Sequence, residues 1–127
     1  MSEDESAIAG VRILIVEDEA LLSLLLEDMV QDLGCTVAGN LSSLEAARGF
    51  LAAAPGPIDL AILDVNLGGT PSYPIAAMLD ERGIPFLFVT GYDERDIDEA
   101  WRDRPRISKP FNVPDLEHAI ARVAGRA

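Results

Sequence analysis

The sequence has little of what several classes of protein depend on. Cys35 is its only cysteine, so the chain has no internal disulfide framework. Its apolar runs are far shorter than the ~20 residues of a membrane-spanning helix. Its first ten residues, MSEDESAIAG, lack the basic and long apolar segments of a signal peptide. Together these absences predict a cytoplasmic protein.

Positive charge is also scarce. The chain has 10 Lys and Arg against 22 Asp and Glu, which gives a formal net charge of −12. Nucleic acids bind basic surfaces through their phosphates, so this balance argues against a nucleic-acid partner. The acidity either serves solubility or reflects carboxylates that bind a cation, and composition leaves both interpretations open.

Length and composition fit one folded domain. The 127 residues correspond to about one domain. Apolar residues make up 49 % of the chain, which is enough for a hydrophobic core. We expect residues 1–10 to form an acidic flexible tail and residues 11–127 to form the domain.

Apolar runs alternate with helix-like segments along the domain. β-branched and apolar runs predict strands, whereas apolar spacing with serine or glycine boundaries predicts helices. The fourth expected helix is short and charged. The expected strands cover residues 11–18, 35–39, 58–64, 85–90 and 104–109, and the expected helices cover residues 20–33, 44–54, 73–82, 94–102 and 113–123.

Five strand–helix repeats predict an α/β fold with helices on both faces of a parallel sheet. Continuously apolar runs such as residues 60–63 support this, because strands covered on both faces need no alternation. We expect a single doubly wound, five-stranded sheet with the flavodoxin-like order 2-1-3-4-5.

Polar side chains stand where these expected strands end. Glu17 and Asp18 follow the first strand, Asp64 ends the third, Thr90 ends the fourth and Lys109 ends the fifth. In an open α/β sheet, ligands bind beyond the carboxyl ends of the strands where the strand order reverses. We therefore expect these side chains to meet in one shallow pocket.

Three carboxylates in one pocket repel each other. Two unit charges ~4 Å apart cost about 4 kcal/mol at an effective dielectric constant of 20. One lysine offsets only part of this repulsion, whereas Mg²⁺ suits a set of oxygen ligands. A cation beside a carboxylate, with a hydroxyl and an ammonium group opposite, is typical of phosphoryl transfer. The implied product is an aspartyl phosphate.

Four motifs resemble those of response-regulator receiver domains of bacterial two-component signalling. In chain order they are VED at 16–18, LDVNLGG at 63–69, FVTGYD at 88–93 and SKPF at 108–111. The resemblance covers residues 11–124. Their order and spacing make it specific.

The resemblance implies a role for each acidic residue. Asp64 would be the phosphoacceptor and would receive its phosphoryl group from a kinase histidine. Asp18 would bind Mg²⁺ directly, with Asp64 as a second ligand, and Glu17 would bind it through water. The backbone carbonyl of Asn66 would be a further ligand.

The resemblance also implies how the phosphoryl group is held and sensed. Thr90 would bond one phosphoryl oxygen and shift on phosphorylation, and Lys109 would pair with another. The Lys109–Pro110 bond is expected to be cis. Arg106 stands where receivers usually have a switch aromatic, so we expect Tyr92 to be the switch residue. The alternative is that Tyr92 only covers the phosphate pocket and slows hydrolysis.

Two segments narrow the resemblance to one subclass of receiver domains. They are FVTGY at 88–92 and NLGGTPSYP at 66–74. These segments resemble a receiver subclass with a Phe-x-Thr-Gly-Tyr motif. Such receivers often occur as stand-alone proteins or at the end of hybrid kinases in alphaproteobacteria.

The expected function is that of a stand-alone, phosphoryl-accepting response regulator in a phosphorelay, not an enzyme with turnover. Expected partners are a histidine kinase or phosphotransfer protein and a downstream protein target, without nucleic acid or membrane. The sequence identifies neither the kinase nor the target, and the oligomeric state stays open.

Two alternatives remain. A degenerate receiver acting as a scaffold is disfavoured because every expected site residue is present. A small phosphatase with an aspartyl nucleophile is suggested by the superficial likeness of DVN at 64–66 to the Asp-x-Asp of haloacid-dehalogenase-type phosphatases. Those enzymes place the nucleophile after the first strand, have a second acid where Asn66 stands, and need a cap domain.

Overall fold

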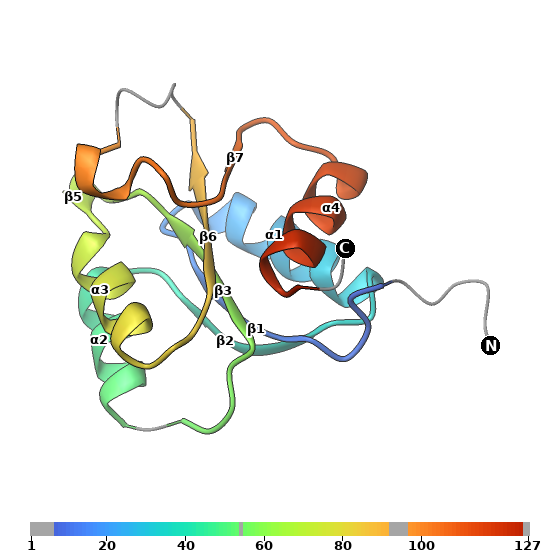
Figure 1. Cartoon of the computed structure of the whole chain (residues 1–127), viewed down its shortest axis with the longest axis horizontal. Coiled ribbons are helices and arrows are strands. Elements are labelled where there is room, and N and C mark those ends of the chain that lie inside the picture. The colour runs from blue at the N-terminus through green and yellow to red at the C-terminus, as the bar shows by residue number, and fades with distance from the viewer. Residues whose placement is uncertain (1–6, 54, 92–96, 126–127) are drawn as a thin grey trace.

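A five-stranded parallel sheet forms the centre of the molecule (Figure 1). The computed structural model describes residues 7–53, 55–91 and 97–125. The order of the sheet is β2-β1-β3-β6-β7, which confirms the expected flavodoxin-like order. In chain order the elements are β1 (Arg12–Val16), α1 (Ala20–Asp32), β2 (Thr36–Leu41), α2 (Leu44–Ala52), β3 (Leu60–Asp64), β4 (Asn66–Leu67), β5 (Thr70–Pro71), α3 (Tyr73–Glu81), β6 (Phe86–Thr90), a 3₁₀ turn η2 (Glu99–Trp101), β7 (Arg106–Ser108) and α4 (Val113–Val123).

Helices cover both faces of this sheet. In Figure 1, α2 and α3 lie on one side of it, and α1 and α4 lie on the other. Side chains alternate between the two layers along each central strand, as the pleat requires. In β3, Ile62 packs in the α1–α4 layer and Leu63 in the α2–α3 layer. Both side chains are fully buried, which explains the continuous apolar runs of the sequence.

The ends of the helices follow the expected punctuation. The Ser43 side chain caps α2 by accepting a hydrogen bond of 3.0 Å from the N–H of Ala46. Gly34 follows α1 with a φ of +88°, the left-handed conformation that favours glycine. A capping box at α4, made by Asn112 and Asp115, was missed from the sequence.

The chain before β1 packs against the core. Ile8 is fully buried in the α1–α4 layer, although it falls within the expected tail of residues 1–10. Cys35 is buried beside it and donates its S–H to the carbonyl of Ile8 over 3.4 Å. Packing therefore includes part of the segment that we expected to be free, and residues 1–6 lie outside the described residues.

An aromatic cluster joins α3, β6 and η2. Trp101 stacks on Tyr73 with ring centroids 6.0 Å apart and an interplanar angle of 3°. It meets Phe88 edge-on at 6.4 Å, and Phe86 lies 6.1 Å from it. Trp101 thus packs on β6 and α3.

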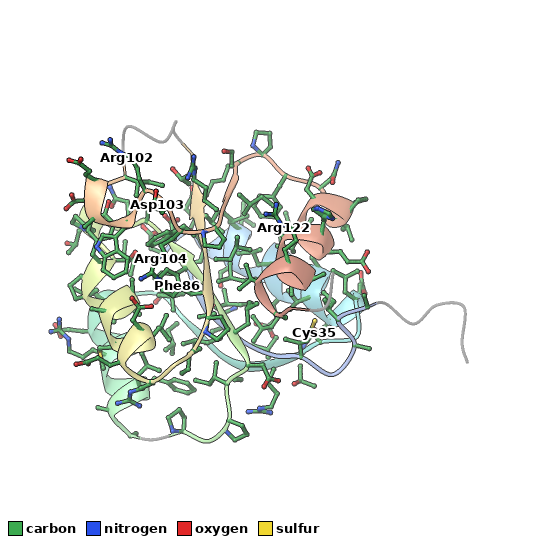
Figure 2. All side chains as sticks on the ribbon, viewed as in Figure 1. Cys35, Phe86, Arg102, Asp103, Arg104 and Arg122 are labelled. Atoms are coloured by element: carbon green, nitrogen blue, oxygen red, sulfur yellow. The ribbon has the colours of Figure 1, made fainter. Side chains whose placement is uncertain are left out.

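Arg104 closes this cluster on its outer side. Its guanidinium lies 5.1 Å from the ring centroid of Trp101 and 5.3 Å from the ring centroid of Phe86. Figure 2 labels Arg104 next to Phe86. The same group forms an ion pair of 2.6 Å with Asp80 at the end of α3. The only helical turn described between β6 and β7 is η2, while the start of the fourth expected helix (residues 94–96) lies outside the described residues.

Between β3 and α3 the chain forms a small antiparallel hairpin, β4–β5, that the sequence analysis did not predict. Asn66 pairs with Pro71, and Leu67 pairs with Thr70. Gly68 and Gly69 form the two-residue turn, with φ angles of +62° and +92°. Two successive positive φ angles favour two glycines, so the Gly-Gly pair was the available signal.

No helix in the described part of the chain is long and apolar enough to cross a membrane.

Candidate functional site

The register of the sheet brings the polar strand ends together. Asp64 pairs with Val89, and Thr90 pairs with Ser108. The last residue of β1 pairs with the residue before Asp64, so Glu17 follows it at the same edge. Because parallel strands share one carboxyl edge, chain segments nearly a hundred residues apart meet here.

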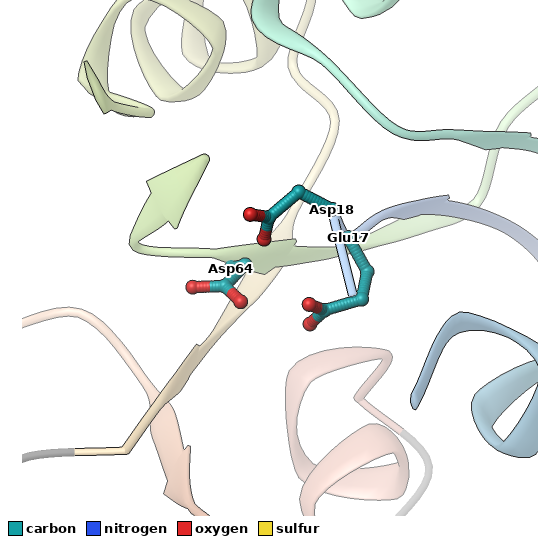
Figure 3. Close-up of side chains that lie close together, drawn as sticks. All are labelled: Glu17, Asp18 and Asp64. Carbon is teal, nitrogen blue, oxygen red and sulfur yellow. The ribbon is translucent and has the colours of Figure 1, made fainter. Parts of the chain in front are cut away.

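Three carboxylates converge at this edge. Oxygen atoms of Glu17, Asp18 and Asp64 lie within 4.8 Å of one another (Figure 3). Glu17 and Asp64 are buried, with 1 % and 6 % of their surface exposed, whereas Asp18 is exposed. The cluster therefore has a buried side and an open side.

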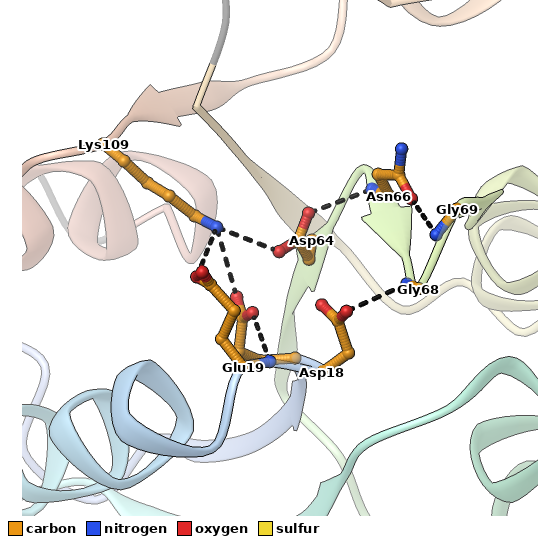
Figure 4. Close-up of polar contacts among 8 residues, drawn as sticks. Asp18, Glu19, Asp64, Asn66, Gly68, Gly69 and Lys109 are labelled. Carbon is orange, nitrogen blue, oxygen red and sulfur yellow. Dashed lines mark hydrogen bonds and ion pairs between the residues drawn. The ribbon is translucent and has the colours of Figure 1, made fainter.

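Lys109 places a cationic group beside these carboxylates. Its Nζ lies 3.1 Å from Oδ2 of Asp64 (Figure 4). The same atom lies 3.9 Å from Oε1 of Glu17. It also lies 3.6 Å from Oε2 of Glu19. Partial burial opposes the charged form of Lys109, but the hydrogen bond to Asp64 and the surrounding carboxylates raise its pKa above the ordinary value. The ammonium group is thus firmly charged.

The surroundings of Glu17 oppose its ionisation, which raises its pKa. Burial, followed by the proximity of Asp64, raises the pKa of Glu17 from 4.5 to about 8. Its Oε2 accepts a hydrogen bond of 3.0 Å from the N–H of Glu19. Its buried Oε1 accepts none from the described residues. A buried carboxylate oxygen without a donor, beside two more carboxylates, fits a hard divalent cation.

Backbone N–H groups hold the other two carboxylates. Oδ1 of Asp64 accepts a hydrogen bond of 2.9 Å from the N–H of Asn66. Oδ2 of Asp18 accepts one of 2.9 Å from the N–H of Gly68, in the turn of the β4–β5 hairpin (Figure 4). The Asn66 side chain accepts one of 2.7 Å from the N–H of Gly69.

These groups line an open cavity of about 530 Å³. Thr90 lies on its wall with 3 % of its surface exposed. The backbone N–H of Lys109 donates a hydrogen bond of 2.8 Å to the carbonyl of Thr90, which ties β6 to the segment after β7. The complete lining consists of Asp18, Glu19, Asp64, Val65, Asn66, Gly68, Gly69, Thr90, Gly91 and Lys109.

Five residues chosen from the sequence thus lie together: Glu17, Asp18, Asp64, Thr90 and Lys109. Asn66 is next to them.

The remaining expectations around the site have separate outcomes. The cis bond between Lys109 and Pro110 is confirmed. Arg106 lies on β7 and donates a hydrogen bond of 2.9 Å to the carbonyl of Arg102. Tyr92 lies outside the described residues.

Two contributors were missed from the sequence. Glu19 is 60 % exposed on its side chain and still reaches Lys109. The Gly68 N–H reaches Asp18 across fifty positions of sequence. The third acid of the Glu-Asp-Glu run at 17–19 and the Gly-Gly pair were the signals available.

An apolar groove adjoins the site on the α1 side. It has a volume of about 640 Å³ and shares Glu19 and Lys109 with the carboxylate cavity. Leu21 and Leu25 line it while 84 % and 49 % exposed. The other lining residues are Ala20, Leu22, Pro110 and Phe111.

Comparison with known proteins gives a consistent result. Residues 13–121 match the family model of the response regulator receiver domain. The solution structure of SdrG from Sphingomonas melonis Fr1 is 41 % identical, covers 93 % of this chain and 98 % of that one, and has a TM-score of 0.78. A solution structure described as the BeF3-activated conformation of SdrG from Pseudomonas melonis Fr1 is 42 % identical, covers 94 % and 98 %, and has a TM-score of 0.77.

A curated relative is longer than this chain. The transcriptional regulatory protein PdtaR of Mycobacterium tuberculosis is 32 % identical over 97 % of this chain. The match spans 61 % of the length of PdtaR, or about three fifths of it.

Proposed function

The chain belongs to the family of response regulator receiver domains, and from this premise we propose that Asp64 accepts a phosphoryl group in a Mg²⁺-dependent reaction. Receiver domains are phosphoacceptor signalling modules rather than classical enzymes, and they partner histidine kinases. The donor we propose is a phosphohistidine of a histidine kinase or of a phosphotransfer protein.

The observation that carries this proposal is the arrangement around Asp64. Its carboxylate ends a central strand, opens on the cavity and is oriented by Lys109 on one oxygen and by a backbone N–H on the other. Such fixed orientation favours attack on a phosphorus atom delivered from the open side. The positive charge of Lys109 offsets part of the negative charge of Asp64, so Asp64 repels an approaching phosphoryl group less strongly.

The proposed transfer is a displacement at phosphorus. An Asp64 oxygen forms the new O–P bond while the P–N bond to the donor imidazole breaks. The imidazole nitrogen leaves with the bonding electron pair, and the product is an acyl phosphate on Asp64. Thr90 and Lys109 lie at the cavity wall, where a hydroxyl and an ammonium group would bond the phosphoryl oxygens.

Magnesium is the cation we propose for the carboxylate cluster. Asp18 and Asp64 would bind it directly, Glu17 through water, and Asn66 through its backbone carbonyl. A bound Mg²⁺ ion neutralises negative charge on transferring phosphoryl oxygens. The donor set supports this assignment, since it consists of oxygens only and includes Oε1 of Glu17, which accepts no hydrogen bond from the described residues.

The adjoining apolar groove is a suitable surface for the phosphodonor protein. It borders the cavity directly, because Glu19 and Lys109 line both. Leu21 is exposed on this groove. Where exposed leucines form a patch, the patch usually marks a surface that contacts another protein. We propose that the donor protein packs apolar side chains here while its phosphohistidine reaches Asp64.

The phosphorylated form would then signal by contacting a downstream protein or by passing the phosphoryl group onward. A cytoplasmic location stays a prediction from the sequence, as does the role of Tyr92 as switch.

The test is labelling of Asp64. The parent chain is incubated with acetyl phosphate and Mg²⁺, and the acid-labile phosphate is located by mass spectrometry. We expect one labelled site, which is lost in Asp64→Asn and in EDTA. Undiminished labelling of Asp64→Asn would overturn the assignment. Sustained turnover of a phosphate ester by the parent would favour a phosphatase instead.

A further inference from the structure

We propose that the side chain of Asn66 positions the Asp18 carboxylate for the cation, acting through the β4–β5 hairpin. This inference rests on the proposed Mg²⁺ site and adds a positioning residue to it. It concerns the amide side chain of Asn66, which is separate from the backbone carbonyl proposed above as a ligand.

Three hydrogen bonds link Asp64 to Asp18 through this hairpin (Figure 4). The N–H of Asn66 donates to Oδ1 of Asp64 over 2.9 Å. The N–H of Gly69 donates to Oδ1 of the Asn66 side chain over 2.7 Å. The N–H of Gly68 donates to Oδ2 of Asp18 over 2.9 Å. The hairpin thus joins the ends of β1 and β3, which carry the two carboxylates.

The Gly68–Gly69 turn by itself stabilises the orientation of the Gly68 N–H only weakly. Gly68 and Gly69 both adopt positive φ angles, and β4 and β5 have two residues each. Glycines lose more backbone freedom on ordering than other residues, and a hairpin this short is marginal by itself. The Asn66 side chain bonds the second glycine of the turn and so fixes where the N–H of Gly68 points.

The consequence for Asp18 is orientation together with electrostatic relief. Asp18 is exposed, so its side chain would otherwise sample several rotamers. The Gly68 N–H engages Oδ2 and leaves Oδ1 for a cation. A backbone donor at this point also offsets part of the repulsion from the neighbouring carboxylates. Asp18 is therefore held near its binding geometry before the cation arrives, which reduces the entropy lost on binding.

Asn66→Ala tests this role, because it removes the side-chain acceptor and keeps the backbone carbonyl. We expect the dissociation constant for Mg²⁺, measured by calorimetric titration, to rise about fivefold, the effect typical of one hydrogen bond. Amide exchange measured by NMR in EDTA should be faster at Gly68 and Gly69 in the variant. Exchange elsewhere and the midpoint of thermal unfolding should stay close to those of the parent.

Two matched variants separate positioning from general loosening. Asn66→Asp keeps an acceptor oxygen, so it should keep Gly69 protected and bind Mg²⁺ at least as tightly as the parent. Thr70→Ala alters an exposed side chain of the same hairpin and should bind Mg²⁺ like the parent. Equal weakening in Thr70→Ala, or weaker binding by Asn66→Asp with Gly69 still protected, would contradict the proposal.

The remaining outcomes distinguish this inference from the proposed function. If Asp18→Ala loses Mg²⁺ binding while Asn66→Ala binds as tightly as the parent, the cation site stands and the positioning role is wrong. If the parent binds no Mg²⁺ in the millimolar range, both are wrong.

Discussion

Nζ of Lys109 lies 3.1 Å from Oδ2 of Asp64, and the same ammonium group reaches Glu19 at 3.6 Å and Glu17 at 3.9 Å. One positive charge therefore lies beside three carboxyl groups, which belong to Asp64 at the end of β3, to Glu17 after β1 and to Glu19 before α1. With Asp18 beside them, the site carries an excess of negative charge. This excess attracts a cation, and it also opposes an incoming phosphoryl group.

Removing Lys109 should therefore shift two properties in opposite directions. We expect Lys109→Ala to bind Mg²⁺ more tightly than the parent, because a positive charge next to the cation site is lost. Labelling by acetyl phosphate at saturating Mg²⁺ should fall, by about tenfold or more if one charge-assisted hydrogen bond to the phosphoryl group is lost. Calorimetric titration and phosphorylation kinetics measure the two effects.

Glu19→Gln is the matched control for Lys109→Ala. It removes a negative charge that also contacts Lys109, so Mg²⁺ affinity should fall slightly rather than rise. Because the Glu19 side chain is 60 % exposed, the free energy of unfolding should change little. A Lys109→Ala variant that binds Mg²⁺ more weakly than the parent would contradict this account of the charges.

The metal-free protein should become less stable as the pH rises from about 4.5 to about 8, because of Glu17. The pKa of Glu17 is higher in the folded chain than in the unfolded chain, so the folded state holds more protons in this range. The contribution of Glu17 to the free energy of unfolding is thus fully present at a pH below its pKa in the unfolded chain. It is lost as the pH rises through its pKa in the folded chain. One proton gives a slope of at most about 1.4 kcal/mol per pH unit.

Denaturant unfolding in EDTA between pH 5 and 8 measures this slope. Glu17→Gln cannot titrate at this position, so its curve should lack the component due to Glu17, and the difference between the two proteins isolates it from other groups. Millimolar Mg²⁺ should flatten the parent curve, because the cation takes the place of the proton. Identical slopes for parent and Glu17→Gln would show that Glu17 ionises normally.

Much of the site could be predicted because it depends on topology. Alternating strand and helix patterns gave the parallel sheet, and a parallel sheet has one carboxyl edge. Any polar residue directly after a strand must lie at this edge, so Asp18, Asp64 and Lys109 could be brought together without knowing a single distance. The charge of each residue then indicated a cation and a phosphoryl group.

What could not be predicted depends on short-range packing. Strands of two residues have too little pattern to reveal a hairpin, so the contact from Gly68 to Asp18 was missed. The stacking of Trp101 on Tyr73 depends on which side a 3₁₀ turn folds back, and periodicity contains no information on this. Ile8 lies in an acidic segment whose charge suggested solvent, yet its own side chain is buried.

The apolar groove beside the site yields a prediction about the donor. Leu21→Ser should slow phosphotransfer from a cognate histidine kinase, because it removes an apolar side chain that lines the groove. Labelling by acetyl phosphate should be unchanged, since a small donor needs no protein contact. Leu24→Ser is the matched control: Leu24 is 64 % exposed on the same helix but does not line the groove. Equal losses in both variants, or a loss with acetyl phosphate, would exclude a specific docking role.

The last prediction concerns how phosphorylation reaches the surface of the domain. Arg106 bonds the backbone of Arg102 and offers no aromatic ring for a switch, so the signal requires another route. Trp101 is suited to report it, because it is the only tryptophan in the sequence and contacts Phe88, two residues before Thr90. Tyr92 stays our candidate for the coupling residue, since it follows Thr90 by two positions.

We expect beryllofluoride, a mimic of the phosphoryl group, to change both Trp101 fluorescence and amide exchange over residues 97–108 in the parent. Tyr92→Ala should lose both changes while still binding beryllofluoride at Asp64, and Tyr92→Phe should retain them if the ring rather than the hydroxyl is needed. Asp64→Asn is the negative control. A full response in Tyr92→Ala would show that the coupling does not pass through Tyr92. The contact of Phe88 with Trp101 would then be the next candidate for the coupling route, to be tested by substitution.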